Sequence, residues 1–169
     1  SNKMVWHATV APGDIVVVDR NCHKSILHAI MMCGAIPIFL TPTRNHYGII
    51  GPIPLDEFRP ENIQKKIDAH PFAKDVKRKP RILTITQSTY DGILYNVDMI
   101  KDLLGDYIDT LHFDEAWLPH ATFHDFYRGM HAIGKNRPRA KEALVFATQS
   151  THKLLAGLSQ ASQILVQDS

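Results

Sequence analysis

Residues 14–19, DIVVVD, are the stretch that decides how this chain is expected to fold. A continuous β-branched run of this length is typical of a strand buried on both faces, as in a parallel sheet covered by helices. Residues 23–34 follow with apolar side chains at helical spacing and end on Gly34, so we predict a helix there. A strand followed at once by a helix predicts a layered α/β fold.

The same alternation continues along the chain. We predict further strands at 36–40, 81–86, 110–116, 143–150 and 161–167, and further helices at 59–71 and 96–107. Such a series predicts a mostly parallel sheet between two helical layers. The chain has 169 residues, 44% of them apolar, which is enough for one core. We therefore predict one three-layer αβα domain over residues 1–169.

Composition argues against two classes of partner. The 19 Lys and Arg residues nearly balance 17 Asp and Glu, for a net charge of +2, and only residues 74–81 concentrate basic side chains. We expect a solvated loop there and no nucleic-acid partner. No apolar run is long enough to span a bilayer, so no membrane partner is expected. Cys22 and Cys33, the only two cysteines, lack metal or redox spacing and fit the reducing cytoplasm.

Reactive side chains follow several predicted strands at their carboxyl ends. His23 follows the first strand, Asp114 and Trp117 end the fourth, and Ser150 and Lys153 follow the fifth. Ligands of open parallel sheets bind beyond the carboxyl ends of the strands. We therefore expect these residues to converge on one edge of the sheet.

A lysine, an acidic partner and small hydroxyl residues suit pyridoxal 5'-phosphate, which needs an amine for its Schiff base and an anion opposite its ring nitrogen. Lys153 lies between a buried-looking strand and an apolar, helix-like run, and burial would favour its neutral, nucleophilic amine. Asp114 would hold the ring nitrogen protonated. The other contacts would come from the Trp117 indole N–H on the phenolate oxygen, the His23 ring on the pyridine face and the Ser150 hydroxyl on the phosphate.

Each of these residues also has a simpler interpretation. A lysine after a strand is usually a solvated loop residue. Asp114 could cap a turn, His23 could begin a helix, and Trp117 could belong to the core. The identity of the surrounding sequence therefore matters more than any single residue.

Four stretches carry a resemblance to a known family: 16–25 (VVVDRNCHKS), 88–92 (STYDG), 111–117 (LHFDEAW) and 150–162 (STHKLLAGLSQAS). They closely resemble the large bacterial lysine, arginine and ornithine decarboxylases, which are pyridoxal-phosphate enzymes of the aspartate-aminotransferase fold. The resemblance extends over nearly the whole chain, residues 1–168. It implies decarboxylation of a basic amino acid to the corresponding amine and CO₂.

The resemblance also implies roles for individual residues. Lys153 would be the Schiff-base lysine and Asp114 the partner of the ring nitrogen, with His23 stacked on the ring. The remaining implied cofactor contacts are Trp117 on the phenolate side, Ser150 and His152 around the phosphate and the internal aldimine, and Ala116. Lys153 or a nearby histidine would return a proton to the substrate. The family further implies a homodimer with active sites at the interface, and higher assemblies of dimers.

The chain departs from the family pattern in several places. Members carry a Gly-Thr-Ser type phosphate loop before the position of Ser1, a smaller C-terminal domain and usually an N-terminal wing, none of which is in this sequence. Leu165 stands where a histidine is common, and Gln87 where an asparagine is usual. We expect the chain alone to bind the cofactor weakly and to turn over substrate poorly.

The sequence leaves the substrate open among arginine, lysine and ornithine. Residues 48–53 and 111–117 look slightly more like arginine-type members, but lysine-specific relatives share much of this background. The stretch 88–92 fits a turn built on Asp-Gly as well as a place beside the cofactor.

Two other functions are also compatible with the sequence. His112, Asp114, His120 and His124 could be drawn as the metal site of a hydrolase, because residues four apart share a helix face. The other rival is a non-catalytic or truncated assembly module that keeps the fold without turnover.

Overall fold

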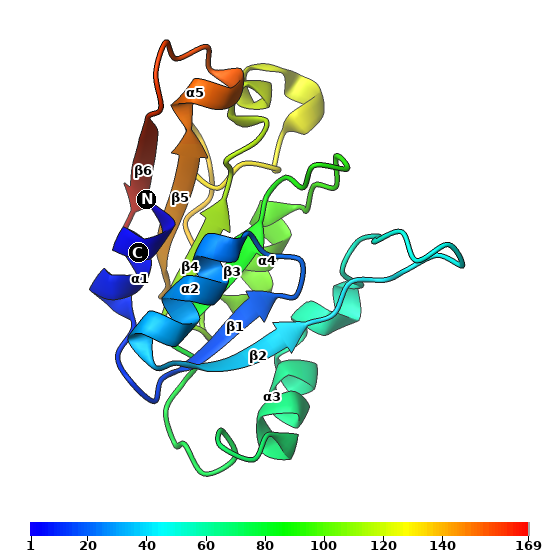
Figure 1. Cartoon of the computed structure of the whole chain (residues 1–169), viewed down its shortest axis with the longest axis vertical. Helices are drawn as coiled ribbons and strands as arrows, with labels where there is room; N and C mark the ends of the chain where they lie inside the picture. The colour runs from blue at the N-terminus through cyan, green and yellow to red at the C-terminus, as the bar shows by residue number, and fades with distance from the viewer. Residues whose placement is uncertain (169) are drawn as a thin grey trace.

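The computed structural model describes residues 1–168 and shows one six-stranded sheet between two helical layers (Figure 1). Ser169, the last residue of the predicted domain, lies outside the described residues. The strands are β1 (Ile15–Asp19), β2 (Ile36–Leu40), β3 (Ile82–Thr86), β4 (Thr110–Asp114), β5 (Leu144–Ser150) and β6 (Ser162–Gln167). The helices are α1 (Asn2–Thr9), α2 (Lys24–Cys33), α3 (Pro60–Ala69), α4 (Val97–Leu104) and α5 (Thr151–Leu154), with 3-10 turns η1 (Leu55–Phe58), η2 (Pro119–Phe123) and η3 (Asp125–Tyr127).

The sheet is mostly parallel, as the sequence predicts. Its strand order is β2-β1-β3-β4-β5-β6, and each neighbouring pair is parallel except β5 with β6. The chain adds β2 on one side of β1 and β3 on the other, which makes a topological switch point beside β1. The antiparallel β6 starts opposite the end of β5, with Ser162 facing Ser150.

The residues of β1 explain why this sheet has helices on both faces. Ile15 and Val17 point into a core shared with α3 and α4, while Val16 and Val18 point into a second core shared with α1 and α2. Alternate side chains of a strand point to opposite faces, so an unbroken apolar run requires two cores. In Figure 1, α2 lies in front of the sheet and α4 behind it. The predicted three-layer αβα architecture is confirmed.

Two elements differ from the prediction. The helix α1 was not predicted, because its segment is largely polar and buries only Val5 and Trp6. The apolar run after Lys153 does not continue as a helix: α5 ends at Leu154, and Ala156 adopts a left-handed backbone with φ of 57°. Leu158 is consequently exposed instead of packed.

Candidate active site

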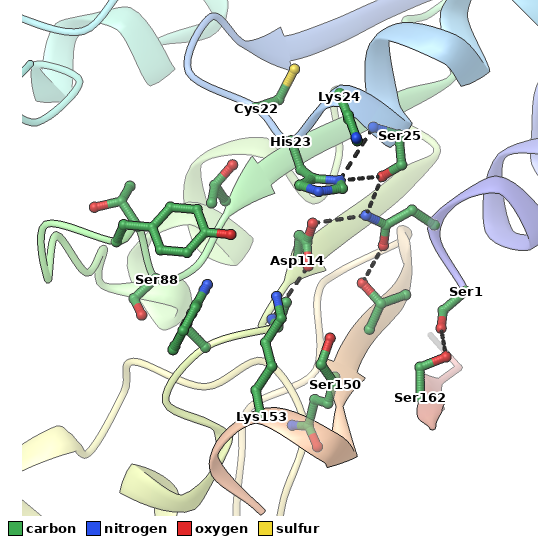
Figure 2. A pocket seen from close by; sticks show the side chains of 18 of the residues that line it. Ser1, Cys22, His23, Lys24, Ser25, Ser88, Asp114, Ser150, Lys153 and Ser162 are labelled. Carbon is green, nitrogen blue, oxygen red and sulfur yellow. Dashed lines mark hydrogen bonds between the residues drawn. The ribbon is translucent and has the colours of Figure 1, made fainter. Parts of the chain in front are cut away.

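A cavity of about 660 Å³ opens at the carboxyl ends of the parallel strands (Figure 2). Its wall takes residues 21–25 after β1, 88–91 after β3, and residues at the ends of β4 and β5. The start of α1 and the start of β6 complete it. The sequence-predicted residues that line it are His23, Asp114, Ala116, Trp117, Ser150, His152 and Lys153. The expected convergence on one edge of the sheet is therefore what the structure shows.

Lys153 enters the cavity from α5, one short turn after β5. Figure 2 shows its side chain extending toward Asp114. Its Nζ lies 5.0 Å from the ring centroid of Trp117, a distance at which a cation is attracted by the aromatic face. The side chain is only partly buried, so the complete burial suggested by the flanking apolar residues is not found.

Asp114 ends β4 and is 4% exposed. Burial raises the pKa of its carboxyl group, because it removes the charged form from water. A hydrogen bond from Asn2 Nδ2 at 2.7 Å, the nearby His23 and Lys153 charges, and the Ala116 N–H at 3.3 Å oppose this shift. Several groups around Asp114 therefore stabilise its anionic form.

Two buried polar atoms at the cavity have no partner. The Trp117 indole Nε1 and the Ser88 Oγ are both enclosed and unbonded. Buried polar groups in folded proteins nearly always have a hydrogen-bond partner. Both residues line the cavity, so we take their unbonded atoms as candidate contacts for a ligand there. Tyr90 packs edge-on against the Trp117 ring, at 4.9 Å between centroids.

His23 caps the N-terminus of α2, so the simpler interpretation of this residue also holds. Its Nδ1 accepts from the backbone N–H of Ser25 and lies 2.9 Å from the Ser25 hydroxyl. These two contacts hold the imidazole ring at the cavity edge, as Figure 2 shows. The ring is exposed on its outer side.

The remaining predicted residues lie along the α5 side of the cavity. Ser150 is the last residue of β5. His152 Nδ1 lies 2.8 Å from the Ala161 carbonyl oxygen, so its ring ties α5 to the segment before β6. The Ser1 hydroxyl donates to the Ser162 hydroxyl across the same wall.

Sequence reasoning missed Asn2. Its side chain bonds to Asp114, Ser25 and Thr148, and it lines the cavity. No motif marks this residue, and the helix that carries it was not predicted. Only the spatial arrangement reveals it.

The four residues of the rival metal site do not come together. Both ring nitrogens of His112 face hydroxyl groups, at 3.2 Å from Thr84 and 3.1 Å from Thr148, and burial lowers its pKa to about 3. His120 and His124 lie in the exposed segment of η2 and η3. Among residues 1–168, no three His, Cys, Asp or Glu side chains are grouped to hold a metal ion.

In the part of the chain that the structure describes, no helix is long and apolar enough to cross a bilayer. Cys22 and Cys33 are both free thiols. Neither observation contradicts the geometry of the cavity.

The sequence matches the family described as "Orn/Lys/Arg decarboxylase, major domain" over residues 1–169. Lysine decarboxylase LdcA of Pseudomonas aeruginosa is 56% identical over 168 residues, which is 99% of this chain and 22% of that protein. The biodegradative arginine decarboxylase of Escherichia coli is 47% identical, again over 99% of this chain and 22% of that protein. The chain thus spans about a fifth of the length of these relatives, 22% of each.

Solved structures agree with this grouping. The structure of lysine decarboxylase A from Pseudomonas aeruginosa matches with a TM-score of 0.91 over 99% of this chain and 22% of that one. A putative aminotransferase from Clostridium difficile, described as PLP-bound, matches with a TM-score of 0.55 at 14% identity, over 99% of this chain and 39% of that one. The second likeness shows a shared fold alone. Because the family match runs from the first residue of the sequence to the last, the chain belongs to the Orn/Lys/Arg decarboxylase family, within its major domain.

Proposed function

We propose that the protein containing this chain decarboxylates a basic amino acid, with pyridoxal 5'-phosphate held in the cavity described above. One observation carries the proposal: Lys153 and Asp114 line the same cavity, and the Lys153 side chain extends toward Asp114. The two residues are 39 positions apart by their numbers and come from different elements, α5 and β4. Membership of the family supports the same activity.

The residues present fit the cofactor. The unbonded Trp117 Nε1 is a buried donor without an acceptor, as a site for an oxygen-bearing ligand requires. Lys153 would bind the aldehyde carbon, and Asp114 would face the ring nitrogen. Ser150, and the Ser1–Ser162 pair, offer hydroxyl groups for a phosphate. When bound, pyridoxal phosphate supplies an electron-withdrawing ring that takes up the electron pair released as CO₂ leaves.

The protein side chains have separate tasks in this proposal. Asp114, as a carboxylate, would hold a proton at the ring nitrogen. His23 would cover one ring face and limit access of water. Lys153 and His23 are the two candidate general acids: either would donate the proton that takes the place of the departing CO₂ on the substrate α-carbon. The aromatic face of Trp117, 5.0 Å from Lys153 Nζ, would help to position the Lys153 side chain.

The substrate class follows from the relatives. Relatives of this chain are named for lysine, arginine and ornithine, all basic amino acids. The lysine decarboxylase at 56% identity exceeds the arginine decarboxylase at 47%, so the slight arginine-like character of residues 48–53 gains no support. Homodimers, higher assemblies of them and a cytoplasmic location belong to the same proposal.

A substrate panel with the full-length protein tests the proposal. Lysine, arginine and ornithine are supplied with pyridoxal phosphate, and cadaverine, agmatine and putrescine are measured. We expect one amine to predominate. Lys153→Ala should abolish release of this amine. Borohydride should then no longer attach the cofactor covalently to the protein, so the protein should gain no cofactor mass. Lys74→Ala removes an exposed lysine outside the cavity and serves as the matched control.

The outcomes separate the rival functions. Amine release that survives Lys153→Ala contradicts the assigned role of this lysine. A full-length protein that binds no cofactor and releases no amine supports the non-catalytic assembly module instead. Stoichiometric zinc with hydrolase activity would support the metal-dependent alternative.

A further inference from the structure

Asn2 uses all the hydrogen-bonding atoms of its side chain in the cavity wall. Its Nδ2 donates to Asp114 Oδ2 at 2.7 Å and to Ser25 Oγ at 3.0 Å, while its Oδ1 accepts from Thr148 Oγ1 at 2.6 Å. Figure 2 draws the bonds to Ser25 and Asp114 as dashed lines. Through one amide, the start of α1 is joined to α2, β4 and β5.

A buried chain of polar groups stands behind Thr148. Trp6 Nε1 donates to Thr84 Oγ1 at 3.1 Å, and Thr84 Oγ1 lies 3.2 Å from His112 Nδ1. His112 Nε2 in turn lies 3.1 Å from Thr148 Oγ1. Trp6, Thr84 and His112 are 0% exposed and Thr148 is 2% exposed. Because water does not reach these groups, each donor has to find its acceptor within the chain.

Only one direction of donation satisfies every member. An indole N–H can only donate and a carboxylate can only accept, so the Asn2 NH₂ group must face Asp114 and its oxygen must face Thr148. Thr148 then gives its single hydrogen to Asn2 and has to accept from His112 Nε2. His112 Nδ1 is left to accept from the Thr84 hydroxyl, which accepts from Trp6. This pattern requires a neutral imidazole, as does the burial that lowers the pKa of His112 to about 3.

We propose that Asn2 is a positioning residue: its amide, held in one orientation by the Trp6–Thr84–His112–Thr148 chain, keeps the Asp114 carboxylate ionised and facing the cofactor. The same NH₂ group reaches His23 through the Ser25 hydroxyl, 2.9 Å from His23 Nδ1. The Asn2 amide thereby helps to hold both residues proposed to flank the cofactor ring, Asp114 and His23. The cofactor part of this inference rests on the proposed function.

Burial of Asp114 is the reason that its carboxylate needs the hydrogen bond from Asn2. Removal from water raises the pKa of this carboxyl group, and the Asn2 bond is the foremost of the interactions that oppose the rise. A hydrogen bond to a charged group shifts an equilibrium by roughly tenfold to a hundredfold. Loss of the bond should therefore let Asp114 take up a proton at a higher pH.

The first test needs no cofactor. In the full-length, cofactor-free protein, the infrared carbonyl band of protonated Asp114 is identified by its absence in Asp114→Asn. In Asn2→Ala we expect this band to appear at a pH higher by about one unit or more, because a tenfold change in ionisation equals one unit. Met4→Ala, an exposed position on the same helix, should leave the midpoint unchanged.

The second test examines the chain that orients the amide. Thr148→Val removes the hydroxyl that fixes Asn2, whereas Thr148→Ser retains it. We expect Thr148→Val to shift the Asp114 midpoint in the same direction as Asn2→Ala, and Thr148→Ser to restore it. A merely structural role for Thr148 would make both variants alike, which would overturn the proposed relay.

Cofactor binding gives an independent readout. Asn2→Ala should weaken equilibrium binding of pyridoxal phosphate by about tenfold or more. The acid limb of the binding profile should move to higher pH, since Asp114 then loses its charge earlier as the pH falls. An unchanged infrared midpoint in Asn2→Ala overturns the inference, whatever the cofactor does. An unsubstituted protein that takes up no pyridoxal phosphate defeats the proposed function, and the infrared result still decides the role of Asn2.

Discussion

Trp117 lines the cavity and has two features whose contributions differ. Its ring face lies 5.0 Å from the Lys153 amine, and its indole N–H is buried without a partner. The ring can be kept while the N–H is removed, so the two contributions can be measured separately.

We predict that Trp117→Phe weakens pyridoxal phosphate binding while changing the stability of the cofactor-free protein only slightly. The substitution removes a donor that the bound ligand would use, which costs about 1 kcal/mol of binding or roughly fivefold in affinity. In the cofactor-free protein the lost ring area is offset by removal of an unsatisfied buried donor. Fluorescence titration and urea unfolding measure the two quantities.

Tyr47→Phe is the control for Trp117→Phe, because Tyr47 is 78% exposed and lies outside the cavity. A large loss of cofactor-free stability in Trp117→Phe, with unchanged cofactor affinity, would show that Trp117 acts only in packing.

At the scale of single elements, the predicted strands agree closely with the observed ones. The run at β1 could be assigned because both of its faces are apolar, and α2 could be assigned because Gly34 ends it with φ of 62°. The helix α1 could not, because its two buried residues stand among polar ones. The stretch after Lys153 was wrongly predicted to be helical, because the spacing of its leucines resembles the buried face of a helix. In the structure Leu158 is exposed.

The candidate site was partly predictable for a similar physical reason. Asp114 ends β4 and Lys153 lies in the short helix α5 just after β5, and the parallel sheet brings the carboxyl ends of its strands together. Asn2 and the partners of His112 could not be predicted, because their bonds join elements distant in sequence. Their roles depend on side-chain contacts that no spacing encodes.

Helix α4 carries a buried cation that links three segments. Lys101 is 1% exposed, and its Nζ donates to the Ala132 and Pro138 carbonyl oxygens and to Gln167 Oε1. Burial lowers its pKa from 10.5 to about 8. The helix is thus attached both to the segment before β5 and to the end of β6.

We predict that the free energy of unfolding rises between about pH 8 and pH 10.5 because of Lys101. In this window the unfolded chain holds the Lys101 proton and the folded chain has lost it, so stability increases with pH. Lys101→Met should remove this contribution to the dependence of the free energy of unfolding on pH. Urea unfolding at several pH values measures it, with the exposed Lys74→Met as control. Identical slopes for Lys101→Met and the unsubstituted protein would contradict the prediction.

On the scale of the whole molecule, exposed apolar side chains gather at the same end as the cavity. Figure 1 shows α5 and the segment of η2 and η3 side by side at this end. The exposed large apolar residues in these segments and the loop after α5 are Phe123, Phe126, Leu154 and Leu158. Contiguous exposed apolar patches mark interaction surfaces, and we propose that these four residues belong to the dimer contact.

We predict that Leu158→Asp weakens the proposed homodimer of the full-length protein. A buried, unpaired carboxylate at an interface is costly, so the dimer dissociation constant should rise by about tenfold or more. Sedimentation equilibrium measures the change. Phe72→Asp, at a 74% exposed position in the loop after α3, is the matched control. Equal dissociation constants for Leu158→Asp and the control would exclude this surface from the dimer contact.

The bonds of Asn2 also bear on how the chain reaches its final form. They connect residues separated by 112 and 146 positions, from α1 to β4 and β5. Contacts across such separations close large loops and form late, after most of the chain entropy has been lost. A nascent polypeptide would therefore assemble the proposed cofactor pocket only after β5 has joined the sheet and Lys153 and Ser162, which also line the cavity, have left the ribosome. Uptake of the cofactor would then report that this stretch of the chain has been synthesised and has folded.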